Sequence, residues 1–261
     1  MSLRPEETDF WKKRLHLQME ESRFYRQLVY EKALVGTRKR ILDIGCGTGS
    51  TLQDMLSYAA RESFITGLDI DEAKLRIASG LLGSKVSFVR ADATSLPFKD
   101  STFDLVTFSY VLLFIKDKEA TMREMYRVTQ KGGAVLAVME PDYSGALYFP
   151  EQELLDKVMI ASLAEEGVDL EAGRKLRFLF TKAGLKTEVG IESRGEYIIP
   201  NSQHIISKRF EESYWLYEKY LLKTGMESDK IKEYLAEYKS KILSGQYFVF
   251  TPVFWALGIK E

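Results

Sequence analysis

The sequence predicts an α/β fold in which helices cover both faces of a mostly parallel β-sheet. Two observations support this class. Between residues 40 and 140, short apolar runs alternate with amphipathic segments of helical period, and that alternation requires the crossover connections of a parallel sheet. The apolar runs are also nearly continuous, which is typical of strands that are buried on both faces.

Amphipathic spacing predicts a first helix from about Asp9 to Leu34, ended near Gly36. Serine and glutamine three residues apart form a capping box at Ser50, so a helix is expected from there towards Ala60. Two further helices are expected at residues 72–82, capped by Asp71 and ended by Gly83, and at residues 116–129. Five strands are expected at "RILDIG" (40–45), "SFITGLDI" (63–70), "KVSFVRAD" (85–92), "FDLVTFSY" (103–110) and "AVLAVME" (134–140).

The second half of the chain has a different texture. Helices are expected at residues 151–167 and 172–184, a sixth strand at residues 185–193, and a long, aromatic helical segment at residues 201–243. A final strand, "YFVFTPVFWALGIK" (247–260), contains Pro252, which fits an edge or an irregularity better than the middle of a sheet. The organisation predicted is one domain over 1–261, with an N-terminal helical part (1–36), a core (37–142) and a C-terminal part (143–261) with a helical cap at about 201–243.

Composition narrows the function. The chain has 261 residues, a net charge of -1 and a pI near 6.3, which argues against a broad basic surface for nucleic acid. A single cysteine, Cys46, excludes an intrachain disulfide and favours a cytoplasmic location. Since no apolar run approaches the length of a membrane span, no membrane partner is expected, and no metal site is predicted.

The stretch "RILDIGCGTGS", Arg40 to Ser50, has three glycines between a strand and a helix. Glycine permits positive φ and close approach of a ligand, and a helix N-terminus adds amide donors. The pattern G-x-G-x-G with leucine at 52 departs from the dinucleotide fingerprint. Asp69 and Asp92 end the next two strands, where carboxylates can accept from ribose hydroxyls and from an adenine amine. A tight turn and two loop caps are the structural alternatives.

Five segments then point to a family: "LDIGCGTG", "GLDID", "RADATSLPF", "FDLVTFSYVLLFI" and "REMYRVTQKGGAVLAVMEP". Together they resemble the motifs of class I S-adenosylmethionine-dependent methyltransferases, most of all the small-molecule branch similar to the ubiquinone/menaquinone biosynthesis enzymes. The resemblance implies a Rossmann-like, seven-stranded sheet with the last strand antiparallel, and a helical insertion between strands six and seven. It implies in-line methyl transfer from S-adenosylmethionine to a small-molecule acceptor.

The resemblance also assigns the cofactor S-adenosyl-L-methionine to particular residues. These are Asp43, Gly45, Cys46, Gly47 and Gly49 along the methionine part, Asp69 at the ribose, Ile70, Asp92 and Ala93 at the adenine, and Ser109, Tyr110 and Val111 beside the sulfonium.

Catalytic residues are left unassigned. Phe114 stands where many relatives have histidine, so no acid/base role follows there. Glu140, Asp142 and Tyr143, in "MEPDY", lie after the fifth strand and are candidates to touch the acceptor, with strand-end capping as the alternative. His204 and His16 are further base candidates, for which a surface or packing role is the alternative.

Other functions stay open. Methylation of protein or RNA, cofactor binding without catalysis and NAD-dependent oxidoreduction are the rivals, the last disfavoured by its missing fingerprint glycine. The aromatic residues of the helical segment favour core packing individually, while the whole segment is a candidate lid over the acceptor. They are Tyr214, Trp215, Tyr217, Tyr220, Tyr234 and Tyr238.

Overall fold

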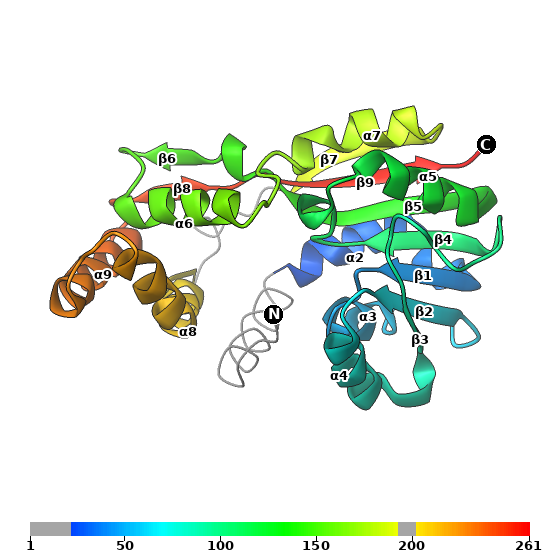
Figure 1. Cartoon of the computed structure of the whole chain (residues 1–261), viewed down its shortest axis with the longest axis horizontal. Helices are drawn as coiled ribbons and strands as arrows, with labels where there is room; N and C mark the ends of the chain where they lie inside the picture. Colours follow the sequence, from blue (N-terminus) through cyan, green and yellow to red (C-terminus); the bar gives the residue numbers. More distant parts are fainter. Residues whose placement is uncertain (1–21, 193–201) are drawn as a thin grey trace. The chain divides into compact units, whose positions relative to one another are not determined.

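The structure is a computed structural model that describes residues 22–192 and 202–261 (Figure 1). Contacts within the chain divide it into two compact units. The sheet unit comprises residues 22–142, 171–192 and 253–261, and the helical unit comprises residues 143–170 and 202–252. That these units act together as one methyltransferase domain, with residues 201–243 as a lid, stays a prediction.

The sheet unit contains a seven-stranded sheet in the order β3-β2-β1-β4-β5-β9-β7. The first five strands pair in parallel, and β9 runs antiparallel to both β5 and β7. This confirms the predicted sheet, with its last strand antiparallel. The strands are β1 (Arg40–Ile44), β2 (Phe64–Asp69), β3 (Ser87–Arg90), β4 (Phe103–Phe108), β5 (Thr129–Pro141), β7 (Lys186–Glu192) and β9 (Val253–Ile259).

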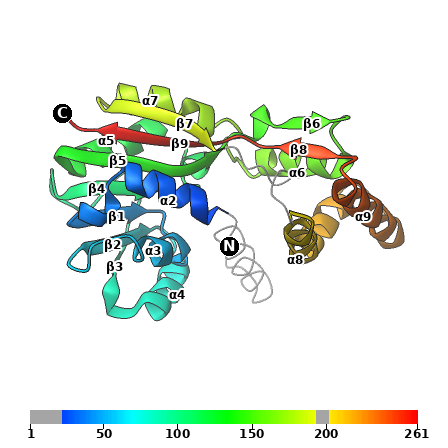
Figure 2. The same cartoon turned by 180° about the vertical axis from the view of Figure 1, so that it is seen from behind.

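Helices cover both faces of this sheet, as the apolar strands predict (Figures 1 and 2). Alternate strand residues enter different cores: Ile41 packs with α2, α3 and α4, whereas Leu42 packs with α5 and α7. The helices are α2 (Arg23–Lys32), α3 (Ser50–Met55), α4 (Glu72–Leu82), α5 (Lys118–Val128) and α7 (Leu176–Lys182). Short 3₁₀ helices are η1 (Val35–Thr37), η2 (Gly83–Lys85), η3 (Leu112–Phe114) and η5 (Gly173–Lys175).

Helix ends agree with the sequence in part. The Asp71 carboxylate accepts from the amides of Ala73 and Lys74 and caps α4, as predicted. The capping box is wrong, because Gly49 with φ +88° is the N-cap of α3 and no side chain caps it. That helix also ends at Met55, short of the expected Ala60. Gly36 does not end the first helix either, since the chain leaves α2 through Leu34, whose φ is +55°.

The helical unit contains α6 (Leu154–Glu165), α8 (Ser202–Leu222), α9 (Ser228–Leu243) and the 3₁₀ helix η4 (Tyr143–Gly145). A two-stranded antiparallel sheet joins β6 (Leu147–Phe149) to β8 (Phe248–Phe250). The single final strand is therefore wrong: β8 and β9 belong to different sheets, and Pro252, which has no N–H for a ladder, lies between them. Aromatic side chains form much of this unit's core, which contains Tyr238, and Tyr220 is also buried, as the core-packing interpretation predicts.

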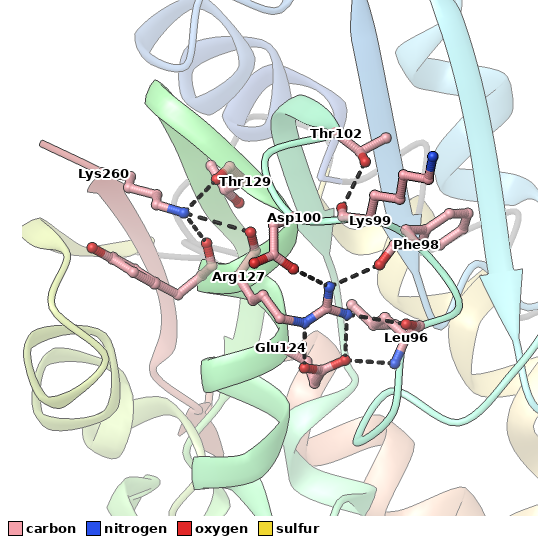
Figure 3. Close-up of polar contacts among 10 residues, drawn as sticks. Leu96, Phe98, Lys99, Asp100, Thr102, Glu124, Arg127, Thr129 and Lys260 are labelled. Atoms are coloured by element: carbon pink, nitrogen blue, oxygen red, sulfur yellow. Dashed lines mark hydrogen bonds and ion pairs between the residues drawn. The ribbon is translucent and has the colours of Figure 1, made fainter.

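An ionic network ties the loop after β3 to α5 (Figure 3). The Arg127 guanidinium donates to the carbonyls of Leu96 and Phe98, at 3.0 and 2.8 Å, and to the carboxylates of Glu124 and Asp100. Glu124 in turn accepts from the Leu96 amide at 2.8 Å. One arginine thus supplies donors to a loop that has no ladder of its own.

Lys260 also donates to backbone carbonyls, at the end of α5. Its ammonium donates to the carbonyls of Tyr126 and Thr129, at 2.8 and 2.7 Å, and lies 4.4 Å from the centre of the Tyr126 ring (Figure 3). A cation suits the Tyr126 carbonyl because the last turn of a helix leaves its carbonyls unpaired and partly negative.

We expect Arg127→Ala to lower the free energy of unfolding by about 1–3 kcal/mol, because two loop carbonyls lose their donor. Arg123→Ala is the matched control on the same helix, since Arg123 is exposed and lies 3.9 Å from Glu119. That control should change stability by less than about 0.5 kcal/mol. Urea denaturation followed by circular dichroism measures both, and equal effects would contradict the role given to Arg127.

Candidate functional site

The glycine loop joins β1 to α3 with three residues in a conformation that favours glycine. The φ angles of Gly45, Gly47 and Gly49 are +67°, +52° and +88°. A Cβ on Gly45 would lie 2.4 Å from Cγ2 of Val111, so the loop passes tightly along that side chain. A Cβ on Gly47 would meet no protein atom within 4 Å. The loop is therefore packed at its start and open at Gly47.

Asp69 holds this loop from the end of β2. Its Oδ2 accepts from the Gly47 amide at 2.8 Å, and its Oδ1 accepts from the Asp71 amide at 2.9 Å. The side chain thus caps backbone amides, as the structural alternative proposed. Each carboxylate oxygen has two acceptor sites, so the same group keeps capacity for a ligand. Ile70, the next residue, is 62% exposed.

Asp43 is a buried carboxylate two residues before the loop. It is 1% exposed, and its Oδ1 accepts from the Thr107 hydroxyl at 2.8 Å. Its Oδ2 has no hydrogen-bond partner among the described residues. Burial raises the pKa of Asp43 to about 7, nearby Asp69 adds to the rise, and the Thr107 hydrogen bond opposes it. Since buried polar atoms are nearly always partnered, this oxygen marks a place for a donor.

Sequence reasoning missed Thr107, although the signal was present. The parallel register sets Asp43 of β1 directly beside Thr107 of β4. Each is a buried polar side chain flanked by apolar residues near the end of its strand. Once the register of β1 and β4 is known, a polar residue at the same level of each strand predicts a buried polar pair.

Cys46 is a structural member of the loop. It is buried, its amide donates to the Leu68 carbonyl at 3.0 Å, and a Cβ on Gly67 would lie 2.9 Å from its sulfur. Burial raises the pKa of its thiol, and Asp43 and Asp69 raise it further. A thiol that keeps its proton is a poor nucleophile.

Asp92 and Ala93 lie in the loop after β3, which Arg127 holds. The Asp92 carboxylate accepts from the amide and the hydroxyl of Thr94, at 2.8 and 2.7 Å. The Thr94 amide and hydroxyl hold the pKa of this carboxyl below its usual range. Ala93 is buried. The turn fixes Asp92 locally, and its contact with adenine stays a prediction.

The chain makes an unusual turn after β4. Tyr110 has φ +56°, a region that non-glycine residues seldom occupy. Its amide donates to the Met139 carbonyl at 2.8 Å, and the next amide, of Val111, donates to Glu140 Oε1 at 2.8 Å. The predicted segment Ser109–Val111 is therefore fixed to the end of β5 and, through Val111, against Gly45.

The base candidates separate into three groups. Glu140 and Asp142 are buried at the end of β5 and hold protein donors; Asp142 pairs with Arg174 through both carboxylate oxygens, one of them at 2.7 Å. Tyr143 belongs to the helical unit. His16 and the side chain of His204 lie outside what the structure describes. Phe114, at the end of η3, is 66% exposed.

Residues 22–192 and 202–261 contain neither a candidate membrane-spanning helix nor a cluster of metal-ligating side chains. None of these helices is both long enough and apolar enough to span a membrane. No three histidine, cysteine, aspartate or glutamate side chains in these ranges gather as metal ligands would.

About half of the chain is similar in sequence to known proteins. Residues 42–137 match the family described as "Methyltransferase domain". The ubiquinone/menaquinone biosynthesis C-methyltransferase of Psychromonas ingrahamii is 29% identical over 146 residues, 54% of this chain and 57% of that protein. The demethylmenaquinone methyltransferase of Lactococcus lactis is 33% identical over 162 residues, 55% of this chain and 64% of that protein. The chain thus spans less than two thirds of the length of these relatives.

A solved structure shares the fold. Phosphoethanolamine N-methyltransferase 2 of Haemonchus contortus, in complex with S-adenosylhomocysteine, has a TM-score of 0.57 at 18% identity, and the match covers 90% of this chain and 52% of that one. The sheet order and the glycine loop are consistent with these matches. Residues 42–137 therefore match a methyltransferase domain and are similar in sequence to the ubiquinone/menaquinone biosynthesis C-methyltransferases, and the chain shares the fold of the solved methyltransferase.

Proposed function

We propose that this protein binds S-adenosylmethionine at the carboxyl ends of β1, β2, β3 and β4 and transfers its methyl group to a small-molecule acceptor. The observation that carries the proposal is Oδ2 of Asp43, which has no hydrogen-bond partner among the residues that the structure describes and is buried two residues before a glycine loop that is open at Gly47. A buried carboxylate oxygen without a donor suits a cationic ligand group.

The residues of this edge fit the cofactor. The amino group of its methionine part would supply the donor that Asp43 Oδ2 lacks. The open side of Gly47 would leave room for the chain that leads to the ribose, and Asp69 keeps acceptor sites for ribose hydroxyls. Ile70 and Ala93 offer apolar surface to the adenine ring, beside the carboxylate of Asp92.

When bound, the cofactor supplies a methyl group on an electrophilic sulfonium. The work left to the chain is to orient the ligand and to exclude water, and orientation alone can lower a barrier by about 7–11 kcal/mol. Ser109, Tyr110 and Val111 would form the wall beside the sulfonium. We assign no base, because Glu140 and Asp142 are both buried and already hold protein donors.

The acceptor to test first follows from the names of the relatives. Both are methyltransferases named for ubiquinone, menaquinone or demethylmenaquinone. A demethylated quinone ring is therefore the first candidate acceptor, and methylation at a ring carbon is the first candidate reaction.

Calorimetry with three ligands and three proteins tests the proposal. The wild type should bind S-adenosylmethionine and S-adenosylhomocysteine and not NAD. Gly47→Val should fold and lose that binding, because its side chain enters space that the protein leaves open. Gly132→Val is the matched control, since Gly132 also has positive φ (+76°) and open space but lies at the start of β5.

Gly132→Val should bind as the wild type does. Because both variants place valine at positive φ, lost binding in Gly47→Val alone would come from the lost ligand space and not from backbone strain. Binding of NAD alone would overturn the proposal. Transfer of a labelled methyl group to a demethylated quinone, and not to the proteins or RNA of an extract, should then identify the acceptor class.

We expect Asp69→Ala to weaken S-adenosylhomocysteine binding by about 1–3 kcal/mol, because its partners lose their acceptor. A 2′-deoxyribose analogue of S-adenosylhomocysteine distinguishes the proposed ribose contact of Asp69 from its hydrogen bond to the Gly47 amide. The wild type should prefer the natural ligand, whereas the variant should bind both ligands equally. Asp92→Ala should keep the preference. A preference unchanged in Asp69→Ala would show that Asp69 holds only the Gly47 loop.

Ligand binding should release a proton through Asp43. Its pKa of about 7 means that the free protein keeps this carboxyl largely protonated below that pH. A cationic amino group favours the carboxylate, so affinity should rise as pH increases towards 7 and then level off. Calorimetry at pH 6 in buffers of different ionisation enthalpy should find up to about one proton released. Asp43→Asn should bind without that release; the same release from the variant would assign the proton elsewhere.

A further inference from the structure

Glu140 reaches its position through an irregularity in β5. Between Ala137 and Glu140, β5 advances three residues while β9 advances two, from Ala256 to Phe254. One extra residue of this kind reverses which face the following side chains meet. Val138 and Met139 accordingly enter the same core, that of α2 and α3.

The extra residue turns Glu140 towards the opposite face, where Val111 and Leu112 pack. Its Oε1 accepts from the Val111 amide at 2.8 Å, while its Oε2 has no hydrogen-bond partner among the described residues. Val111 is the N-cap of η3, where the first backbone amides have no partner inside the helix. The side chain is fully buried, and Gly173 covers its backbone, since a Cβ there would lie 2.6 Å from the Glu140 carbonyl.

This contact has a consequence for the glycine loop. Val111 is the residue that the Glu140 carboxylate holds through its backbone, and its side chain is the one that presses on Gly45. The preceding residue, Tyr110, is held by Met139, the neighbour of Glu140. The end of β5 thereby sets how closely the segment after β4 approaches the loop after β1.

Burial raises the pKa of Glu140 to about 8, against the opposing effects of the Val111, Leu112 and Leu113 amides and of Lys118 at the start of α5. A group that is fully buried and holds the Val111 amide is poorly placed to take a proton from an acceptor. The contacts instead suit a part in shaping the site.

We propose that Glu140 is a positioning residue for the cofactor: by accepting the Val111 amide, it holds Val111 against Gly45 and sets the wall beside the sulfonium. This rests on the proposed function for the identity of the ligand. The contact itself does not depend on that identity, so the two can be tested apart.

The test compares Glu140→Ala, Glu140→Gln and Asp104→Ala. Asp104 is the matched control, because its carboxylate also accepts from consecutive amides, those of Lys39 and Arg40, but at the opposite edge of the sheet. Hydrogen exchange of residues 109–115 reports the position of the wall, and calorimetry reports the affinity for S-adenosylhomocysteine. Circular dichroism verifies that each variant is folded.

Glu140→Ala should speed exchange at residues 111–113 and weaken binding by about tenfold or more, equivalent to about 1.4 kcal/mol. Glu140→Gln keeps an acceptor oxygen and should bind within about threefold of the wild type. Asp104→Ala should speed exchange near Lys39 and leave affinity unchanged. If Glu140→Ala does not fold, Glu140→Met, of similar length and without an acceptor, replaces it.

Wild-type affinity in Glu140→Ala, or a Glu140→Gln variant as weak as Glu140→Ala, would overturn the proposal. Failure of the wild type to bind S-adenosylhomocysteine would instead overturn the proposed function. Exchange at residues 111–113 would in that case still test the contact, and unchanged exchange in Glu140→Ala would overturn it.

Discussion

Loops that leave the carboxyl edge of a parallel sheet carry backbone amides that no strand can pair, and in this protein carboxylates at the strand ends accept them. Asp69 takes the amide of Gly47, and Glu140 takes that of Val111. Asp92 does the same within its own turn. The shape of the candidate site therefore depends on acidic side chains that serve first as acceptors for the backbone, because buried amides need hydrogen-bond partners.

Two of the buried carboxylates each keep one oxygen without a hydrogen-bond partner among the described residues, and they differ in what holds the other oxygen. Oε1 of Glu140 accepts from the Val111 amide. Asp43 has only the Thr107 hydroxyl, a weaker partner than several amides or a cation, and its second oxygen has none among the described residues. A carboxylate left in this state raises the energy of the ligand-free protein, and a cationic ligand lowers it. The two differ in their surroundings: Asp43 precedes the glycine loop that is open at Gly47, which favours a ligand contact, whereas Glu140 holds the Val111 amide, which favours a positioning contact.

Local sequence patterns predicted the parts of this fold that depend on neighbours in the chain. The strand ranges, the Asp71 cap and the glycine loop all follow from short-range chemistry. The extra residue in β5 could not be predicted, because "AVLAVM" before Glu140 is apolar throughout and carries no alternation that would show a change of face. The break at Pro252 was visible as an irregularity, but the assignment of β8 to another sheet depends on pairing with β6, about a hundred residues earlier.

The strained turn at Tyr110 shows how these contacts depend on one another. A non-glycine residue at φ +56° costs about 1–3 kcal/mol and persists only where its surroundings fix it. Here Met139 holds the Tyr110 amide through its carbonyl, and Glu140 holds the next amide through its side chain. Only the extra residue in β5 lets these two consecutive positions address the same turn, one by backbone and one by carboxylate. The irregularity in β5 and the strained backbone of Tyr110 therefore act together: both are needed to bring Val111, after β4, against Gly45.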